Sequence, residues 1–158
     1  MSDRAAGPTI VVGYDGSDAS REALRRAARR AAPDGLVVVV HAYDLPPDLL
    51  GSPDYGGLLA GRQAHGRALL EALPMSGPDE LLDADYETEL IGGPAAEAIA
   101  TVASVRDADE IIIGARGHGR IRALLGSVSL EVLHHADRPV TVIPAAGIAA
   151  GPDRPAGA

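Results

Sequence analysis

The sequence predicts an α/β fold: a single-domain open five-stranded parallel sheet of order 3-2-1-4-5, with helices on both faces. Three observations lead to this prediction. Short β-branched runs alternate along the chain with longer segments of helical periodicity. Residues 36–40 are apolar at successive positions, as in strands buried on both faces of a parallel sheet. Residues 111–113 form an apolar run that stops at a glycine-rich turn, a typical place for a ligand.

The length and composition indicate one domain. The 158 residues contain no central linker, and we expect a flexible arm at residues 1–8, a domain at residues 9–144 and a disordered tail at residues 145–158. The chain has no Cys, Trp or Phe, which excludes disulfides and thiol chemistry and predicts an aliphatic core.

The charge and hydropathy pattern argue against nucleic acid and membrane partners. Fourteen basic and 22 acidic residues give a net charge of −8, which repels phosphate backbones. The longest uninterrupted aliphatic run, residues 36–40, is too short to span a bilayer, and the first residues lack the basic and apolar regions of a secretion signal. We therefore expect a cytoplasmic protein.

The first third of the chain reads as strand, helix, strand. Residues 9–13 form a buried strand that runs into a cluster of turn and cap residues. A helix begins at Ser17 or Asp18, with Ala and Leu on one face and five arginines on the other. These arginines form either a solvated face that balances an acidic body or a site for an acidic partner. A second strand follows at residues 36–43.

The middle of the chain contains a loop, a helix and an edge strand. Residues 44–57 hold three prolines and three glycines, which predicts a long loop that could act as a mobile lid. A helix is expected at about residues 58–73, and residues 82–90 alternate between apolar and acidic side chains, as expected for an edge strand. The candidates for burial in this helix are Leu59, Ala68, Leu69, Ala72 and Leu73.

The last third again alternates helices and strands. Pro94 suits the first turn of a third helix, and the fourth strand covers residues 110–113. The fourth helix runs from Gly126 or Ser127 to about Ala136, and a last short strand lies between Pro139 and Pro144. The expected buried side of the third helix is Ala98, Ile99, Val102 and Val105.

The glycine-rich turn after strand four predicts a phosphate site. Glycines at 114, 117 and 119 allow backbone N–H groups to approach a ligand closely, and Ser127 can cap a helix whose dipole favours an anion. The alternative is a loop that needs glycine only for positive φ. In the predicted strand order Asp15 faces this turn across the crevice, which favours the phosphate interpretation.

These motifs resemble those of the universal stress protein family over roughly residues 8–144. The similarity lies in Val-Val-Gly-Tyr-Asp-Gly-Ser at residues 11–17, Gly114-Ala-Arg-Gly117, and Gly126-Ser127-Val-Ser. The ATP-binding branch has Gly, two residues, Gly, nine residues, Gly and then Ser or Thr. Here eight residues separate Gly117 from Gly126, so the loop between them or Gly119 must absorb the difference.

The resemblance implies a Rossmann-like domain that binds ATP, with or without Mg²⁺, in a stress-response sensor or regulator. Asp15 would lie beside the ribose or adenine, and the Ala42 backbone would meet the adenine. Gly114, Gly117, Gly126 and Ser127 would hold the phosphates, with Val128 close by and Gly119 sharing a phosphate contact. The resemblance also implies a homodimer through residues 140–143 (Val140 to Ile143), an apolar strand that the predicted order places at the sheet edge.

No catalytic set is evident in the sequence. It contains no Walker loop, nucleophile elbow or His-Glu-x-x-His pair, so hydrolysis is expected to be slow or absent. Two alternatives stay open: an ATP-using enzyme of related architecture, and a dimeric scaffold that binds no nucleotide.

Overall fold

The computed structural model describes residues 7–46, 53–115 and 125–144. The predicted disordered tail and most of the predicted arm lie outside the described residues, and so do Gly117 and Gly119. The roles of these segments stay predictions.

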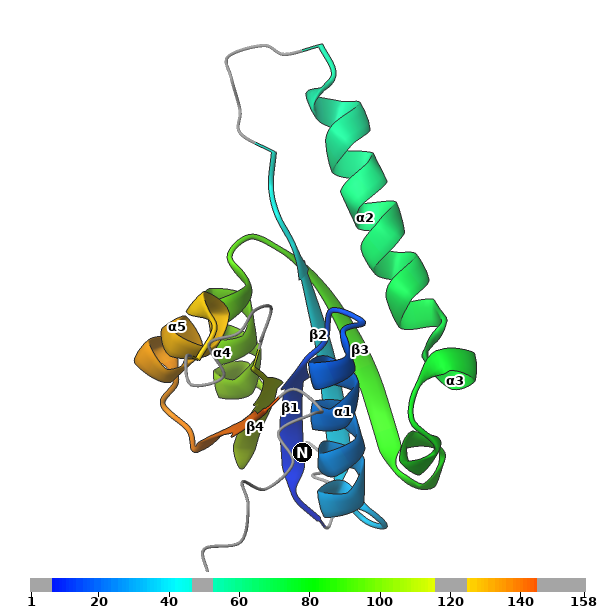
Figure 1. Cartoon of the computed structure of the whole chain (residues 1–158), viewed down its shortest axis with the longest axis vertical. Coiled ribbons are helices and arrows are strands. Elements are labelled where there is room, and N and C mark those ends of the chain that lie inside the picture. Colours follow the sequence, from blue (N-terminus) through cyan, green and yellow to red (C-terminus); the bar gives the residue numbers. More distant parts are fainter. Residues whose placement is uncertain (1–6, 47–52, 116–124, 145–158) are drawn as a thin grey trace, which may run out of the picture.

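The described chain forms a five-stranded sheet of order β3-β2-β1-β4-β5 in which every pair is parallel. This confirms the predicted fold class, and Figure 1 shows helices on both sides of the sheet. The elements are β1 (Thr9–Gly13), α1 (Asp18–Ala31), β2 (Leu36–Tyr43), α2 (Tyr55–Glu71), α3 (Leu73–Ser76), the 3-10 helix η1 (Asp79–Asp83), β3 (Asp85–Gly92), α4 (Ala95–Val105), β4 (Glu110–Gly114), α5 (Ser127–His135) and β5 (Val140–Ile143).

Two hydrophobic cores lie on opposite faces of the sheet. Successive residues of β1 alternate between them: Ile10 and Val12 pack against α1, and Val11 packs against α4. The first core also takes in Leu70 of α2, and the second takes in Val132 of α5. Burial on both faces explains why the β1 and β2 segments read as continuous apolar runs.

The sheet register brings three strand ends to one edge. Gly13 pairs with Val40 of β2, and Val12 pairs with Ile112 of β4. The residues that follow β1, β2 and β4 therefore emerge side by side at the carboxyl edge, where open α/β sheets bind ligands.

Helix α2 differs from its prediction at both ends. It begins at Tyr55, although Gly56 and Gly57 are poor helix formers, so the preceding loop is shorter than expected. Its buried residues are Gly66 and Leu70, whereas the expected Ala68 and Ala72 are exposed. The reason is that only the carboxyl half of α2 docks on the sheet, and this contact selects Gly66 and Leu70, with Leu73 just after the helix also buried.

Two further expectations are wrong: the start of the edge strand at residue 82 and the burial of Val105. Residue Leu82 belongs to η1, not to the edge strand, and is 73% exposed; β3 begins three residues later, at Asp85. The alternating pattern did not distinguish the strand from the turn before it. Val105 is 78% exposed because α4 ends there and the chain turns back toward β4. The edge position of β3 is confirmed.

Four of the five arginines of α1 form ion pairs within the molecule. Arg25 and Arg26 contact Glu22 on the same helix, Arg29 contacts Glu80 of η1 at 2.6 Å, and Arg30 contacts Glu110 of β4 at 3.0 Å. Arg25 also reaches Glu80, at 3.2 Å. The arginine face of α1 therefore has internal partners, which favours the structural interpretation over an acidic partner.

Within residues 7–46, 53–115 and 125–144, no helix is both long enough and apolar enough to cross a bilayer.

Candidate functional site

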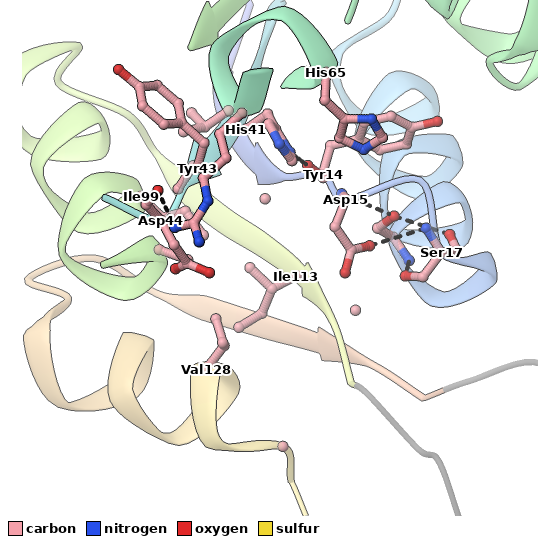
Figure 2. A pocket seen from close by; sticks show the side chains of 18 of the residues that line it. Tyr14, Asp15, Ser17, His41, Tyr43, Asp44, His65, Ile99, Ile113 and Val128 are labelled. Carbon is pink, nitrogen blue, oxygen red and sulfur yellow. Dashed lines mark hydrogen bonds between the residues drawn. The ribbon is translucent and has the colours of Figure 1, made fainter. Parts of the chain in front are cut away.

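A cleft of about 920 Å³ lies at the carboxyl edge of the sheet (Figure 2). Its lining comes from the carboxyl ends of β1, β2 and β4 and the residues just after β1 and β2, from the amino-terminal turns of α1, α4 and α5, and from one face of α2. It contains all six sequence-predicted site residues that the structure describes: Asp15, Ala42, Gly114, Gly126, Ser127 and Val128.

The turn after β1 holds the Asp15 carboxylate at the cleft. Asp15 Oδ1 accepts a hydrogen bond from the Ser17 backbone N–H at 3.0 Å. Gly16 has φ +78°, a conformation that favours glycine. The α1 cap is Ser17, whose Oγ accepts from the Ser20 N–H at 3.2 Å. Asp15 thus shapes the turn and does not cap the helix, and its side chain points toward the open space in Figure 2.

The end of β2 is tied to the end of β1 through His41. The distance between His41 Nδ1 and the Tyr14 carbonyl oxygen is 2.8 Å, and because a carbonyl only accepts, Nδ1 carries the proton. Ala42 follows in the strand, paired with Ile91 of β3. Sequence reasoning missed His41 because its partner is a backbone atom 27 positions away.

Gly114, at the end of β4, has a packing role that is independent of any ligand. A Cβ at this position would lie 2.5 Å from the backbone carbonyl carbon of Ala19 in α1. A side chain would therefore push α1 away from the sheet. The expected alternative of positive φ is wrong here, since the described glycines with positive φ are Gly16 and Gly93.

The amino end of α5 opens into the cleft without a side-chain cap. The N-cap residue is Gly126, and Ser127 is the first helical residue, so the expected capping by Ser127 is wrong. Glycine has no side chain to satisfy the N–H groups at the start of the helix. These donors, together with the helix dipole, make a suitable anion site.

Helix α2 supplies a wall that sequence reasoning did not find. Gly57, Leu58, Gly61, Arg62 and His65 line the cleft. Gly57, Gly61 and His65 are four residues apart, and so are Leu58 and Arg62, so all five residues lie on one face of the helix. The repeat of glycine and polar residues along one helical face is the signal in the sequence that indicates this wall. The prediction of a loop at residues 44–57 concealed it, because the helix already begins at Tyr55.

Two hydrogen bonds fasten this wall to the end of β2. Arg62 donates through Nη1 to the Asp44 carbonyl oxygen at 2.8 Å, and Gln63 donates through Nε2 to the Tyr43 hydroxyl at 2.9 Å. Gly66 lies against the ring of His41: a Cβ there would come within 2.8 Å of His41 Cδ2. These contacts hold α2 beside the cleft.

A search for metal-binding groups in residues 7–46, 53–115 and 125–144 finds no cluster of three or more His, Asp or Glu side chains suited to a metal ion. His134 and His135 lie in α5 with their ring centroids 5.9 Å apart, outside the lining of the cleft.

Comparison with known proteins gives relatives that are universal stress proteins. A universal stress protein of Thermus aquaticus is 37% identical over 139 residues, which cover 85% of this chain and 97% of the relative. The universal stress protein Rv2623 of Mycobacterium tuberculosis is 34% identical over 157 residues, which cover 90% of this chain and 50% of the relative. This chain thus spans about half the length of that second relative.

Solved structures share the fold. The universal stress protein UspA from Lactobacillus plantarum has a TM-score of 0.69 at 24% identity and covers 89% of this chain and 99% of its own. A universal stress protein solved in complex with cAMP has a TM-score of 0.56 at 26% identity, with coverage of 89% and 99%. One from Archaeoglobus fulgidus, solved with dAMP, has a TM-score of 0.51 at 26% identity, with coverage of 88% and 98%.

The profile of the universal stress protein family matches residues 8–144, which include every strand and helix described above. The chain belongs to the universal stress protein family.

Proposed function

We propose that this protein binds ATP or another adenine nucleotide in the cleft and acts as a stress-response sensor or regulator. The observation that carries the proposal is the convergence of six predicted residues on one cleft, although they come from four separate segments: Asp15, Ala42, Gly114, Gly126, Ser127 and Val128. Gly117 and Gly119, the other two predicted contacts, lie outside the described residues.

The chemistry of the cleft suits the parts of a nucleotide. The uncapped amino end of α5 offers backbone donors for phosphate oxygens. The Asp15 carboxylate offers acceptors for ribose hydroxyl groups. Two related structures hold cAMP and dAMP, which supports an adenine nucleotide as the ligand class.

We expect ATP hydrolysis to be slow or absent. Phosphoryl transfer needs an oriented nucleophile and strong charge stabilisation in the transition state. Asp15 is the candidate for a contact with Mg²⁺ if the nucleotide brings one. Steady multiple-turnover ATPase activity that disappears in Asp15→Asn would contradict this expectation and favour the alternative of an ATP-using enzyme.

Calorimetry with Gly126→Val tests the nucleotide site. A branched side chain at Gly126 enters the cleft at the start of α5, and its backbone conformation (φ −61°, ψ 160°) accepts any residue, so the fold should survive. We expect ATP affinity to fall at least tenfold, about 1.4 kcal/mol. Gly114→Val is unsuitable because it would collide with the Ala19 backbone.

The control is Ser104→Val, on the exposed side of α4 and outside the lining of the cleft. It should bind ATP as the wild type does. Unchanged binding by Gly126→Val would refute the site. A folded wild-type protein that binds no adenine nucleotide, and releases none on acid quenching, would refute the proposed function and favour the scaffold alternative.

We also propose a homodimer through β5. This strand lies at the sheet edge and pairs with β4 on one side. The carbonyls of Pro139 and Ile143 accept hydrogen bonds from β4 and the residue after it, so the backbone groups of Val140 and Val142 face away from the sheet. A second copy, antiparallel across a two-fold axis, would pair with them.

The direction of these backbone groups gives a matched pair of proline variants. Val142→Pro removes an outward N–H and should give a folded monomer, whereas Thr141→Pro removes an inward N–H and should destabilise the sheet. Light scattering and circular dichroism measure the two outcomes. A wild-type protein that is monomeric at tens of micromolar would contradict the dimer.

A further inference from the structure

Arg62 of α2 has a neutral hydrogen-bond partner, whereas four arginines of α1 form ion pairs with acids. Arg25, Arg26, Arg29 and Arg30 all contact carboxylates. Arg62 lines the cleft, and the partner given for its guanidinium among the described residues is a neutral one, the Asp44 carbonyl oxygen at 2.8 Å. One hydrogen bond uses one of five N–H donors, so the group is oriented but keeps donors available for a ligand.

The place of Arg62 in the fold puts it far from the anion site. The sheet order places β1 between β2 and β4. Arg62 is fastened to the segment after β2, whereas the open amino end of α5 lies on the β4 side. Since neighbouring strands lie about 4.8 Å apart, β2 and β4 are separated by roughly 10 Å. A nucleotide with its phosphates at α5 would extend its nucleoside toward Arg62.

The surface around Arg62 leaves room for a flat ring. Gly57 and Gly61 lie on the same face of α2, and a Cβ at either position would meet no heavy atom of the described residues within 4 Å. Packing therefore does not explain these glycines, in contrast to Gly66, where a Cβ would lie 2.6 Å from Leu90 Cδ1. A purine could lie against this part of the helix without meeting side chains at those two positions.

The chemistry of arginine suits this position. A guanidinium is planar, always charged and weakly hydrated. It can stack on the face of an aromatic ring or, in a different orientation, donate hydrogen bonds to acceptors at the ring edge. We propose that Arg62 contacts the base at the nucleoside end of the bound nucleotide, so that it sets affinity for the base and not for the phosphates. This inference rests on the proposed nucleotide-binding function.

Calorimetry with ATP, AMP and adenosine tests the inference, using competition against ATP where adenosine binds weakly. We expect Arg62→Ala to weaken all three ligands by the same factor, about fivefold to thirtyfold, which corresponds to about 1–2 kcal/mol. Arg62→Lys keeps the charge but loses the plane, so it should recover less than half of this loss in free energy. Arg67→Ala removes a charge from an exposed position of α2 outside the cleft and should match the wild type.

The outcomes separate this inference from the proposed function. A loss that is large for ATP, smaller for AMP and absent for adenosine would place Arg62 at the phosphates and overturn the inference alone. Unchanged binding by Arg62→Ala would do the same. A folded wild-type protein that binds none of the three ligands would overturn both.

Discussion

Helices α1 and α2 lie on the same face of the sheet and both border the cleft, but they are built in opposite ways. Helix α1 has a serine cap, seven buried residues and arginines paired with acids. Helix α2 has no side-chain cap, two buried residues and four glycines. Figure 1 shows α1 against the sheet and the amino half of α2 extending past the core.

Helix α1 contributes more to the stability of the fold than the amino half of α2. The buried Ala and Leu stripe of α1 contributes to the first core, so α1 should be among the last elements to open. The amino half of α2 buries little and contains residues of low helix propensity, so its own free energy of folding is small. Packing against the sheet therefore accounts for little of the sequence in this half.

The largest predicted effect comes from the same substitution made in each helix. Leu24 in α1 is fully buried, whereas Leu58 in α2 is 54% exposed. Leu24→Ala should lower the free energy of unfolding by about 2–5 kcal/mol because it leaves a cavity. Leu58→Ala should change it by no more than about 0.5 kcal/mol. Urea unfolding followed by circular dichroism measures both, and equal losses would contradict the contrast between the helices.

A pair of glycine variants sharpens the comparison within α2. Gly56→Ala and Gly61→Ala should each favour the local helix by up to about 1 kcal/mol, which hydrogen exchange of residues 55–65 would detect. Gly61 lines the cleft and Gly56 does not. Only Gly61→Ala places a methyl group where the ligand is proposed to lie, so it should weaken ATP binding relative to Gly56→Ala. Identical affinities would show that the ligand does not approach this face.

The smallest predicted effect concerns the acid sensitivity of α1. Burial alone would raise the pKa of Glu22, but hydrogen bonds and charge from Arg26 and Arg25 outweigh it and lower the pKa below its ordinary value. The ionised carboxylate therefore stabilises the fold above its unfolded pKa, and this contribution is lost as the pH falls through the folded pKa. In acid titrations of stability, Glu22→Gln should show a shallower loss than the wild type.

An exposed glutamate of α2, Glu71, provides the control for this titration. If Glu22→Gln and the wild type lost stability in parallel on acidification, the ion pairs of α1 would have no measurable role in stability.

The sequence predicted the sheet better than the helix that borders the site. Residues 10–12 of β1 and 36–40 of β2 are apolar at every position because both faces of the sheet are covered, and such runs are visible without knowledge of their partners. The start of α2 was predicted three residues late because Gly56 and Gly57 disfavour a helix, and propensity carries no information about distant contacts. Val105 fits the helical repeat, yet the chain turns before any element covers it.

Some residues of the candidate site could be predicted from the sequence and others could not. Asp15 and Gly126 could be proposed from the sequence because turn and cap residues follow apolar runs in the order that an α/β fold requires. His41 and Arg62 could not, since their hydrogen bonds end on backbone carbonyls, which every residue has and which no pattern marks.

Patterns within the sequence were enough to predict the order of strands and helices, the two-sided burial of the sheet and the edge at which a ligand would bind. These properties depend on local periodicity and on the handedness of crossovers, and both act through short stretches of chain. Only the tertiary structure decided why Gly114 must be glycine and which face of α2 borders the cleft. Gly114 lies against the Ala19 backbone, which is 95 positions away in the sequence, and α2 takes its orientation from contacts with β2 and β3. Close packing between distant segments leaves no periodic signal in the sequence of either segment.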